Sequence, residues 1–503
     1  EPVNLHGYQL LHEGALALSQ VSQNGIVVDV EYCKRKSKFL GRKMDREIEK
    51  LKRTELGETW LELFSEPKWA TGDAQLREVL FGKNGFQIEP IKFTEKTKYK
   101  KNPTPATDAE ALEQIDLDGI DELRRIKKWQ QTRATFLAGI IREAVRGVLH
   151  PFFSLHTVQT FRSSSQNPNW QNVPVRDPEI GKLIRQAVHP RKGRLLVEID
   201  FSGVEVRVAA CYHKDPVMIA DITDPDRDMH RDLAQEAYIL TLEEMGAKGG
   251  KGYKLIRYSG KNGFVFPQFY GDFYRNNAKA MWHNIDSLDL HRADGTDLKT
   301  HLRSHGIKNY LDFEEHIKKV ENWFWKEKYP VYNTWGENWY ATYRERGWLE
   351  MLTGFRCSGL MRRNQVINYP VQGAAFHCLL WSLIHLQKWL KANHMKSLII
   401  GQIHDSIILD IHPDEYDAVL SMAYRIMEQK IREVWKWIIL PLEVEAEVSP
   451  IGASWNLKKE ITRNVPPCKC GTQHLYKLPV KDQEGSITGW RTECPICRET
   501  RDL

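Results

Sequence analysis

The clearest hydrophobic pattern in the chain is an apolar run that ends in a carboxylate. Residues 195–199 are mostly apolar, which is typical of a buried strand, and Asp200 follows them directly. After a break at 201–203, apolar residues return between Val204 and Ala210. The pattern predicts a core strand, a turn and a helix, with Asp200 where the strand ends. In isolation, such an aspartate most often caps the helix that follows it.

A second apolar pattern of this kind lies near the other end of the chain. Two apolar runs, 398–403 and 406–411, flank His404 and Asp405, which predicts a hairpin with a carboxylate at its bend. Two carboxylates at the ends of adjacent buried strands are costly unless a positive charge neutralises them. A pair of magnesium ions would do this, and would hold the attacking and leaving oxygens of a phosphoryl transfer. The two patterns together predict a metal-dependent site at Asp200 and Asp405.

The first part of the chain has a helical pattern. Apolar positions at helical spacing predict a helix within 1–24, and a turn leads from it into a short strand at 26–29. A long charged helix is predicted from residue 31 to about residue 56, and an amphipathic helix at 121–146. We therefore expect a mixed α and β protein whose N-terminal part is mainly helical.

Length and charge narrow the class of protein only slightly. A chain of 503 residues is too long for one compact core, so two to four domains are expected. Lys and Arg exceed Asp and Glu by 72 to 66, which is compatible with binding a polyanion but does not establish it. No apolar run is long enough to span a membrane, and no secretory signal opens the chain. Because the first residue is Glu1, we expect a fragment of a longer protein.

The cysteines fall into two groups. Cys468-x-Cys470 and Cys494-x2-Cys497 form two pairs at the C-terminal end, a pattern typical of a zinc ribbon with one structural zinc ion. His474 is an alternative ligand, and a disulfide or free thiols are the alternative reading of the pairs. We expect the ribbon to be a structural unit or a nucleic-acid contact, separate from the chemistry. The other four are predicted to be free thiols: Cys33, Cys211, Cys357 and Cys378. Free thiols favour an intracellular location, the cytoplasm or nucleoid, which also suits a phage-encoded protein.

Asp-Phe-Ser-Gly-Val-Glu-Val-Arg-Val from Asp200 and Ile-His-Asp-Ser from Ile403 resemble the two metal-binding motifs of family A DNA polymerases. Further segments match in the same order up to about Trp455. The resemblance implies an α+β right-hand fold with an antiparallel palm sheet, largely helical fingers and thumb, and a small added zinc ribbon. It divides the chain into an N-terminal entry helix and thumb (1–150), a first part of the palm (151–225), the fingers (226–345), a second part of the palm (346–460) and the zinc ribbon (461–503).

The segment 157–176 is dense in amides, hydroxyls and arginines and has little apolar periodicity. It resembles the family segment that contacts DNA behind the active site, with Phe161 and Ser163 where the family usually has Gly and Leu. A turn cluster with only a structural role is the alternative. The resemblance implies contacts to primer–template DNA from this segment and from two later ones, by Arg162, Asn169, Gln171, Asn172, Asn368, Gln372 and His404.

The segment 257–271 resembles the family's fingers helix, which closes over the nucleotide, but it carries one extra residue between Lys261 and Phe266. Pro267 inside a helix would cost about 3 kcal/mol. We therefore predict a π-bulge or a local break that absorbs the extra residue. The resemblance implies that the dNTP is bound by Arg257, His230, Glu205, Phe266 and Tyr270, together with Lys261.

The resemblance implies a DNA-directed DNA polymerase acting in replication or repair. Asp200 and Asp405, with the Phe201 carbonyl, would hold two Mg²⁺ ions while the primer 3′-hydroxyl attacks a dNTP and releases pyrophosphate. Lys261 would protonate the pyrophosphate, and Glu205 would exclude a 2′-hydroxyl. Primer–template DNA and dNTPs are the expected partners, no membrane is involved, and no sequence feature assigns a processivity partner.

Two other functions are compatible with parts of this pattern. A single-subunit RNA polymerase or a reverse transcriptase also has a palm, although Glu205 together with Tyr270 argues against the former. A catalytically inactive binding protein of the same fold is the second alternative, and the intact Asp200 and Asp405 argue against it. No exonuclease carboxylate cluster is recognisable in the sequence, so we expect no proofreading from it.

Overall fold

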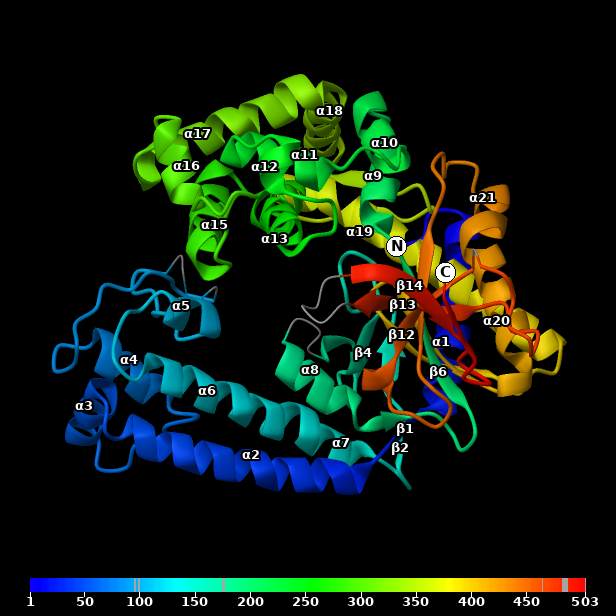
Figure 1. The fold of residues 1–503 in the computed structure, drawn as a ribbon, viewed down its shortest axis with the longest axis horizontal. Helices are drawn as coiled ribbons and strands as arrows, with labels where there is room; N and C mark the ends of the chain where they lie inside the picture. The colour runs from blue at the N-terminus through cyan, green and yellow to red at the C-terminus, as the bar shows by residue number, and fades with distance from the viewer. Residues whose placement is uncertain (95, 98–99, 174–176, 464, 482–486, 503) are drawn as a thin grey trace.

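The computed structural model describes residues 1–94, 96–97, 100–173, 177–463, 465–481 and 487–502. Figure 1 shows three parts: a sheet with its covering helices on the right, a pair of long helices at the lower left, and a cluster of helices at the top. We call these parts the palm, the thumb and the fingers. Among the helices of the described residues, none combines the length and hydrophobicity that crossing a bilayer requires.

The palm contains an antiparallel sheet in the order β15-β14-β13-β12-β11-β6-β10-β9. Its strand β6 is buried except at Glu198 and Asp200, which agrees with the apolar run in the sequence. Helices α1 and α19 pack together and cover the core side of β9 and β10. The strands are β6 (Leu195–Phe201), β9 (Leu398–Ile403), β10 (Ser406–Ile411), β11 (Val444–Val448), β12 (Lys459–Thr462), β13 (Leu475–Lys481), β14 (Ile487–Glu493) and β15 (Thr500–Asp502).

Helices complete the palm around this sheet. The chain enters through α1, and α19 is the longest helix of the described residues, with Pro370 inside it. The palm helices are α1 (Leu5–Asn24), α8 (Pro178–Arg185), α9 (Val204–His213), α19 (Arg363–Ala392), α20 (Tyr416–Tyr424), η6 (Arg425–Lys430) and α21 (Ile431–Val434), with the short turns η2 (Trp170–Asn172), η5 (Pro413–Glu415) and η7 (Trp455–Leu457). Smaller sheets are formed by β1 (Ile26–Val28), β2 (Val148–Leu149) and β5 (Val188–His189), by β3 (Phe152–Ser154) and β4 (Ser164–Gln166), and by β7 (Trp348–Glu350) and β8 (Arg356–Ser358).

The sheet continues from the palm into the predicted ribbon. Strand β12 pairs with the palm strand β11 on one side and with the ribbon strand β13 on the other. Ile461 and Tyr476, both buried, belong to the same hydrophobic core as the palm strands. Arg463 makes two hydrogen bonds to Glu428, at 2.9 and 2.7 Å, and its guanidinium lies 3.8 Å from the Tyr424 ring centre. The ribbon predicted as a separate unit is thus joined to the palm by backbone pairing and by packing.

The thumb consists mainly of two long helical segments that lie side by side (Figure 1). The predicted amphipathic helix is confirmed as a continuous helical segment from Ile120 to Glu143 with a π-helical turn in its middle. Leu40, Leu123 and Ile126 form part of the contact between the two segments, and all three are fully buried. The thumb helices are α2 (Val30–Leu51), α3 (Glu55–Leu63), α4 (Asp73–Phe81), α5 (Ala109–Glu113), α6 (Ile120–Gln131), η1 (Thr132–Leu137) and α7 (Ala138–Glu143).

The fingers confirm the predicted π-bulge. A π-helical turn, Lys261–Val265, follows α13 and takes up the extra residue, and Pro267 lies at the start of the next helix, where its ring is tolerated. The buried Asp215 caps two helices, accepting from Val217 and Met218 of α10 and from the first residues of α18. The elements are α10 (Pro216–Thr223), α11 (Met229–Tyr238), α12 (Leu242–Met245), α13 (Lys251–Gly260), η3 (Lys261–Val265), α14 (Phe266–Phe269), α15 (Tyr274–Ser287), α16 (Leu298–Ser304), α17 (Tyr310–Trp323), η4 (Phe324–Lys328) and α18 (Pro330–Arg346).

Candidate active site

Strand register brings Asp200 and Asp405 together. Asp200 is near the end of β6, and Asp405 lies in the two-residue turn between β9 and β10. Ser406, which follows Asp405, is directly opposite Asp200 in the sheet. The backbone N–H of Phe201 donates to the carbonyl of Asp405 at 3.3 Å. Two carboxylates far apart in the sequence therefore meet at one end of adjacent strands.

The environment of the pair disfavours two negative charges. Burial, together with the neighbouring Asp405 and Glu198, raises the pKa of Asp200 to about 8. Burial is also the main cause that raises the pKa of Asp405. One Asp200 oxygen, Oδ1, is buried and accepts no hydrogen bond from any described residue. Closely spaced carboxylates with an unpaired buried oxygen fit a divalent cation that prefers oxygen ligands, such as Mg²⁺.

The turn that carries Asp405 is held by a buried glutamine. Gln402 donates to the carbonyl of His404 at 2.7 Å, and His404 has a backbone φ of 50°, which is uncommon for a residue other than glycine. The Gln402 Oε1 atom accepts from Ser163 at 2.6 Å and from Gln171 at 2.5 Å. The polar segment 157–172 and the His404–Asp405 turn are therefore joined through one side chain. The sequence reasoning missed Gln402, whose only signal was a polar residue inside an apolar strand.

Most of the predicted DNA-contacting residues line one cavity. It has a volume of about 220 Å³ and lies beside the His404–Asp405 turn; among its lining residues are Arg162, Asn169, Gln171, Asn172 and His404. Asn368 and Gln372 are one helical turn apart on α19, and Asn368 lines a different cavity that it shares with Gly271. The structure therefore groups five of the seven predicted residues.

Glu205 connects the palm to the fingers. It is in the first turn of α9, where its Oε2 accepts a hydrogen bond from the Tyr270 hydroxyl at 2.8 Å. Its other oxygen pairs with Arg162. Burial and the adjacent Glu205 raise the pKa of Tyr270 well above its usual value. Arg162, predicted to contact DNA, is thus also an ion-pair partner of the predicted sugar-selecting residue.

The predicted nucleotide-binding residues of the fingers also cluster. Arg257 pairs with Asp228, the N-cap of α11, at 2.5 Å. The Phe266 ring lies 5.6 Å from the His230 ring and 4.9 Å from the Lys261 ammonium. The π-helical turn therefore keeps these three residues in contact despite the extra residue.

Burial lowers the pKa of two residues in this cluster. Burial and the adjacent Arg257 and Lys261 lower the pKa of His230 to about 4, and its Nδ1 is buried without a partner among the described residues. Burial and Arg257 also lower the pKa of Lys261, which Glu445 partly opposes. Glu445 is paired with Asp200 across β11 and β6, so Lys261 faces the strands that carry the carboxylates. The cluster therefore combines cations with a buried ring nitrogen that has no partner among the described residues.

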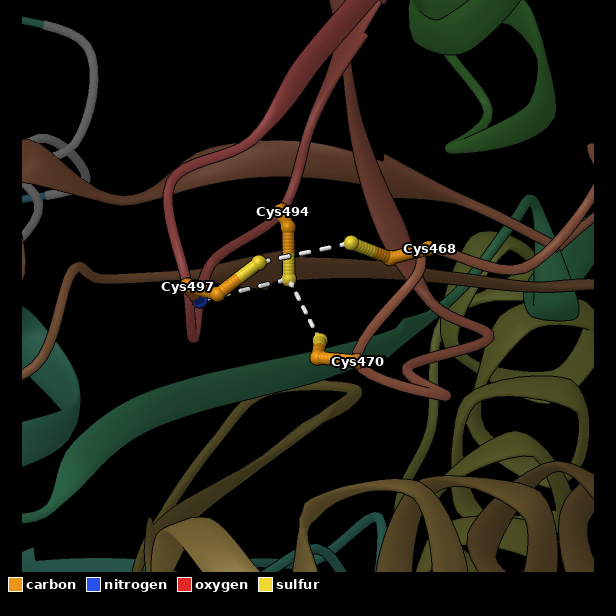
Figure 2. A group of neighbouring side chains, drawn as sticks. All are labelled: Cys468, Cys470, Cys494 and Cys497. Atoms are coloured by element: carbon orange, nitrogen blue, oxygen red, sulfur yellow. Dashed lines mark hydrogen bonds between the residues drawn. The ribbon is translucent and has the colours of Figure 1, made fainter.

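The four C-terminal cysteines converge on one point (Figure 2). Their sulfur atoms all lie within 4.8 Å of one another, with Cys468 and Cys497 at 3.3 Å and Cys470 and Cys494 at 3.6 Å. Tetrahedral zinc with Zn–S bonds of about 2.3 Å requires sulfur atoms about 3.8 Å apart. The backbone N–H of Cys497 donates to the Cys494 sulfur at 3.4 Å. The cluster can hold a zinc ion.

His474 has a different role from the alternative ligand considered in the sequence. Its Nδ1 lies 2.7 Å from Asp417 of α20, and its ring stacks on Tyr424 at 5.8 Å. The group of metal-ligating side chains found among the described residues contains the four cysteines and not His474. His474 therefore fastens the ribbon to the palm. The remaining cysteines, Cys33, Cys211, Cys357 and Cys378, are buried free thiols, as predicted.

A family model, DNA polymerase family A, matches residues 38–265 and 308–456. The chain is 30% identical to DNA polymerase I of Lactococcus lactis over 395 residues, which cover 76% of this chain and 39% of that protein. It is 27% identical over 456 residues to the thermostable DNA polymerase I of Thermus thermophilus, covering 88% of this chain and 47% of the relative. The chain thus spans less than half of the length of these relatives.

The fold was also compared with solved structures. The polymerase domain of Pol1 from M. smegmatis, in complex with DNA primer-template and dNTP, matches with a TM-score of 0.68 and 19% identity, over 89% of this chain and 70% of that one. This similarity confirms the α+β fold expected from the sequence, with palm, fingers and thumb. The family match ends at residue 456, before the cysteine cluster. The chain belongs to DNA polymerase family A.

Proposed function

We propose that this chain is a DNA-directed DNA polymerase, which extends a primer on a template strand with dNTPs. The observation that carries the proposal is the pair Asp200 and Asp405, with an unpaired buried oxygen, next to strands that face the cationic fingers cluster. Carboxylates that hold metal ions, opposite cations that bind phosphates, form the arrangement that phosphoryl transfer needs.

Asp200 and Asp405, with the Phe201 carbonyl, would hold two Mg²⁺ ions. When bound, these ions lower the pKa of the primer 3′-hydroxyl and stabilise the charge on the leaving pyrophosphate. Lys261 and Arg257 would neutralise the triphosphate, and the neutral His230 would donate or accept through its unpaired Nδ1. Because the pKa of Lys261 is lowered, its ammonium gives up a proton to the pyrophosphate more readily than an exposed lysine would.

The cavity beside the His404–Asp405 turn would receive the minor groove of the primer–template duplex. Its amides can donate to the acceptors that all correct base pairs present there, and Arg162 can bind a primer phosphate or base edge. Asn368 and Gln372 would extend this contact along α19. Gln171 would contact the bound base pair, and it is hydrogen bonded to Gln402, which holds the turn that carries Asp405. The geometry of the base pair would therefore affect the position of Asp405.

Glu205 and Tyr270 would select the deoxyribose sugar. Their hydrogen bond fixes a carboxylate and an aromatic ring at the junction of palm and fingers. The 2′-hydroxyl of a ribonucleotide would clash with both groups, whereas a deoxyribose, which lacks this hydroxyl, would not. Phe266, whose ring contacts both Lys261 and His230, would pack against the nucleotide.

The four cysteines would hold one structural zinc ion, since a site closed by four thiolates leaves no position for a catalytic water. We also propose an intracellular location, since buried free thiols and a thiolate metal site persist best in a reducing compartment.

The test is single-nucleotide primer extension with the purified chain in Mg²⁺. The expected result is incorporation of the dNTP complementary to the template base, and much slower incorporation of the three others. Parallel reactions with rNTPs and with an RNA template separate this activity from an RNA polymerase and a reverse transcriptase. Binding of primer–template without any extension would contradict the proposal and favour a binding protein of the same fold.

A further inference from the structure

One partly buried carboxylate next to the site has no part in the mechanism above. Glu198 precedes Asp200 by two residues on β6, so both side chains are on the same face of the sheet. Its side chain is 14% exposed, and strand register places it diagonally from Ser406, the residue that follows Asp405. A third carboxylate at this position raises the electrostatic cost of the Asp200–Asp405 pair, so we expect Glu198 to have a role that offsets this cost.

The two oxygens of Glu198 have separate partners. Oε1 lies 3.2 Å from the Ser406 hydroxyl, whose single proton it shares with the Ile403 carbonyl at 3.0 Å. Oε2 accepts from the Trp455 indole at 2.9 Å and pairs with Lys458, whose side chain is 11% exposed. The second oxygen is therefore anchored and charge-neutralised, which leaves the first oxygen to hold Ser406.

The anchor is itself rigid. The Trp455 ring stacks on Trp170 with centres 5.6 Å apart, and the Arg185 guanidinium lies 5.0 Å from the centre of the Trp455 ring. Lys458 also binds Glu447 at 2.5 Å, which is opposite Glu198 on β11. Glu198 is thus locked into one rotamer by partners from two parts of the chain.

We propose that Glu198 is a positioning residue, which fixes the His404–Asp405 turn through its hydrogen bond to Ser406. Gln402 holds this turn from one side at the His404 carbonyl, and the Glu198–Ser406 pair holds it from the other. The turn needs both supports because His404 has a left-handed backbone conformation. Lys458 keeps Glu198 neutralised, so the carboxylate orients Asp405 without competing for the metal ions. The inference rests on the proposed function.

The test compares three variants. Glu198→Ala and Ser406→Ala each remove one end of the hydrogen bond, and Ser406→Ala leaves the Glu198 anchor intact if the first variant folds poorly. Glu447→Ala is the matched control, because it removes the other carboxylate on Lys458 without touching Ser406. We expect the maximal single-turnover insertion rate to fall about tenfold in both test variants, with an unchanged KM for dNTP and unchanged DNA affinity. The control should stay within about twofold of wild type.

A second readout does not depend on catalysis. Hydrogen exchange of the peptide that spans 403–408 should be faster in Glu198→Ala and Ser406→Ala, and unchanged in Glu447→Ala. The double variant should be no slower in insertion than Ser406→Ala alone, because Ser406→Ala already removes the bond that Glu198→Ala removes. Additive losses, an equal loss in the control, or unchanged exchange at 403–408 would each overturn the inference. An inactive wild-type enzyme would instead refute the proposed function, and the exchange result would still stand.

Discussion

Tyr476 offers a direct test of whether the cysteine-bearing segment is part of the palm. Its ring comes from β13 but is fully buried in the core that β6 and β10 share. Replacing it with alanine removes a large buried aromatic ring, so we expect Tyr476→Ala to lower the palm's free energy of unfolding by about 3–5 kcal/mol. The Tyr476 hydroxyl is buried and has no hydrogen-bond partner among the described residues. Tyr476→Phe should therefore be neutral or stabilise the palm by about 1 kcal/mol.

The assay is urea denaturation of the zinc-loaded protein, followed by hydrogen exchange of the β6 amides as the probe of the palm. Trp490→Ala is the control, since that ring is on the neighbouring strand β14 but 40% exposed, and its loss should cost less than about 1 kcal/mol. If Tyr476→Ala left β6 exchange and the palm transition unchanged, the segment would fold independently of the palm. The continuous sheet would then not contribute to the palm's free energy of unfolding.

Three other predictions follow from the site. Glu205→Ala should raise the rNTP to dNTP ratio of kcat/KM by about 10–100-fold, because it removes the carboxylate that binds Tyr270, and an unchanged ratio would exclude Glu205 as the sugar-selecting residue. The folded-state pKa of Asp200 is raised to about 8, from about 3.9 in the unfolded chain. Without metal, the charged pair therefore lowers the free energy of unfolding more and more as the pH rises through this range. The gain in melting temperature on adding Mg²⁺ should thus be larger at pH 8 than at pH 6, and Asp405→Asn should remove the difference. Cys494→Ser should abolish the binding of one equivalent of zinc, measured by metal analysis, whereas Cys211→Ser should leave it unchanged, since Cys211 is far from the cluster in the sequence and hydrogen bonds within its own helix.

Features with a local cause could be predicted from the sequence. The two apolar runs that end at Asp200 and Asp405 fixed the strands, and alternation in a buried sheet then brought the carboxylates to one end. The extra residue after Lys261 had to be absorbed within one helix, so the π-helical turn was foreseeable. The spacing of the four cysteines likewise predicted their convergence.

Contacts between distant polar side chains could not be predicted. Gln402 and Glu198 each interrupt an apolar strand, but nothing local says that their partners are Gln171 and Ser406. The pairing of β11 with β12 depends on which sheet edge is free after the palm has folded. The sequence therefore did not indicate that the ribbon continues the palm sheet. These features depend on tertiary packing, which periodicity and spacing do not encode.

We propose that Asp200 and Asp405 hold the metal ions for nucleotidyl transfer. The most direct measurement is the single-turnover rate of dNTP incorporation by Asp405→Asn, beside its affinity for primer–template DNA. We expect incorporation to become undetectable, because the substitution removes one of the two charges that would hold the metal ions, while DNA affinity stays within about threefold of wild type. Incorporation within about tenfold of the wild-type rate, a barrier change of only about 1.4 kcal/mol, would contradict the account.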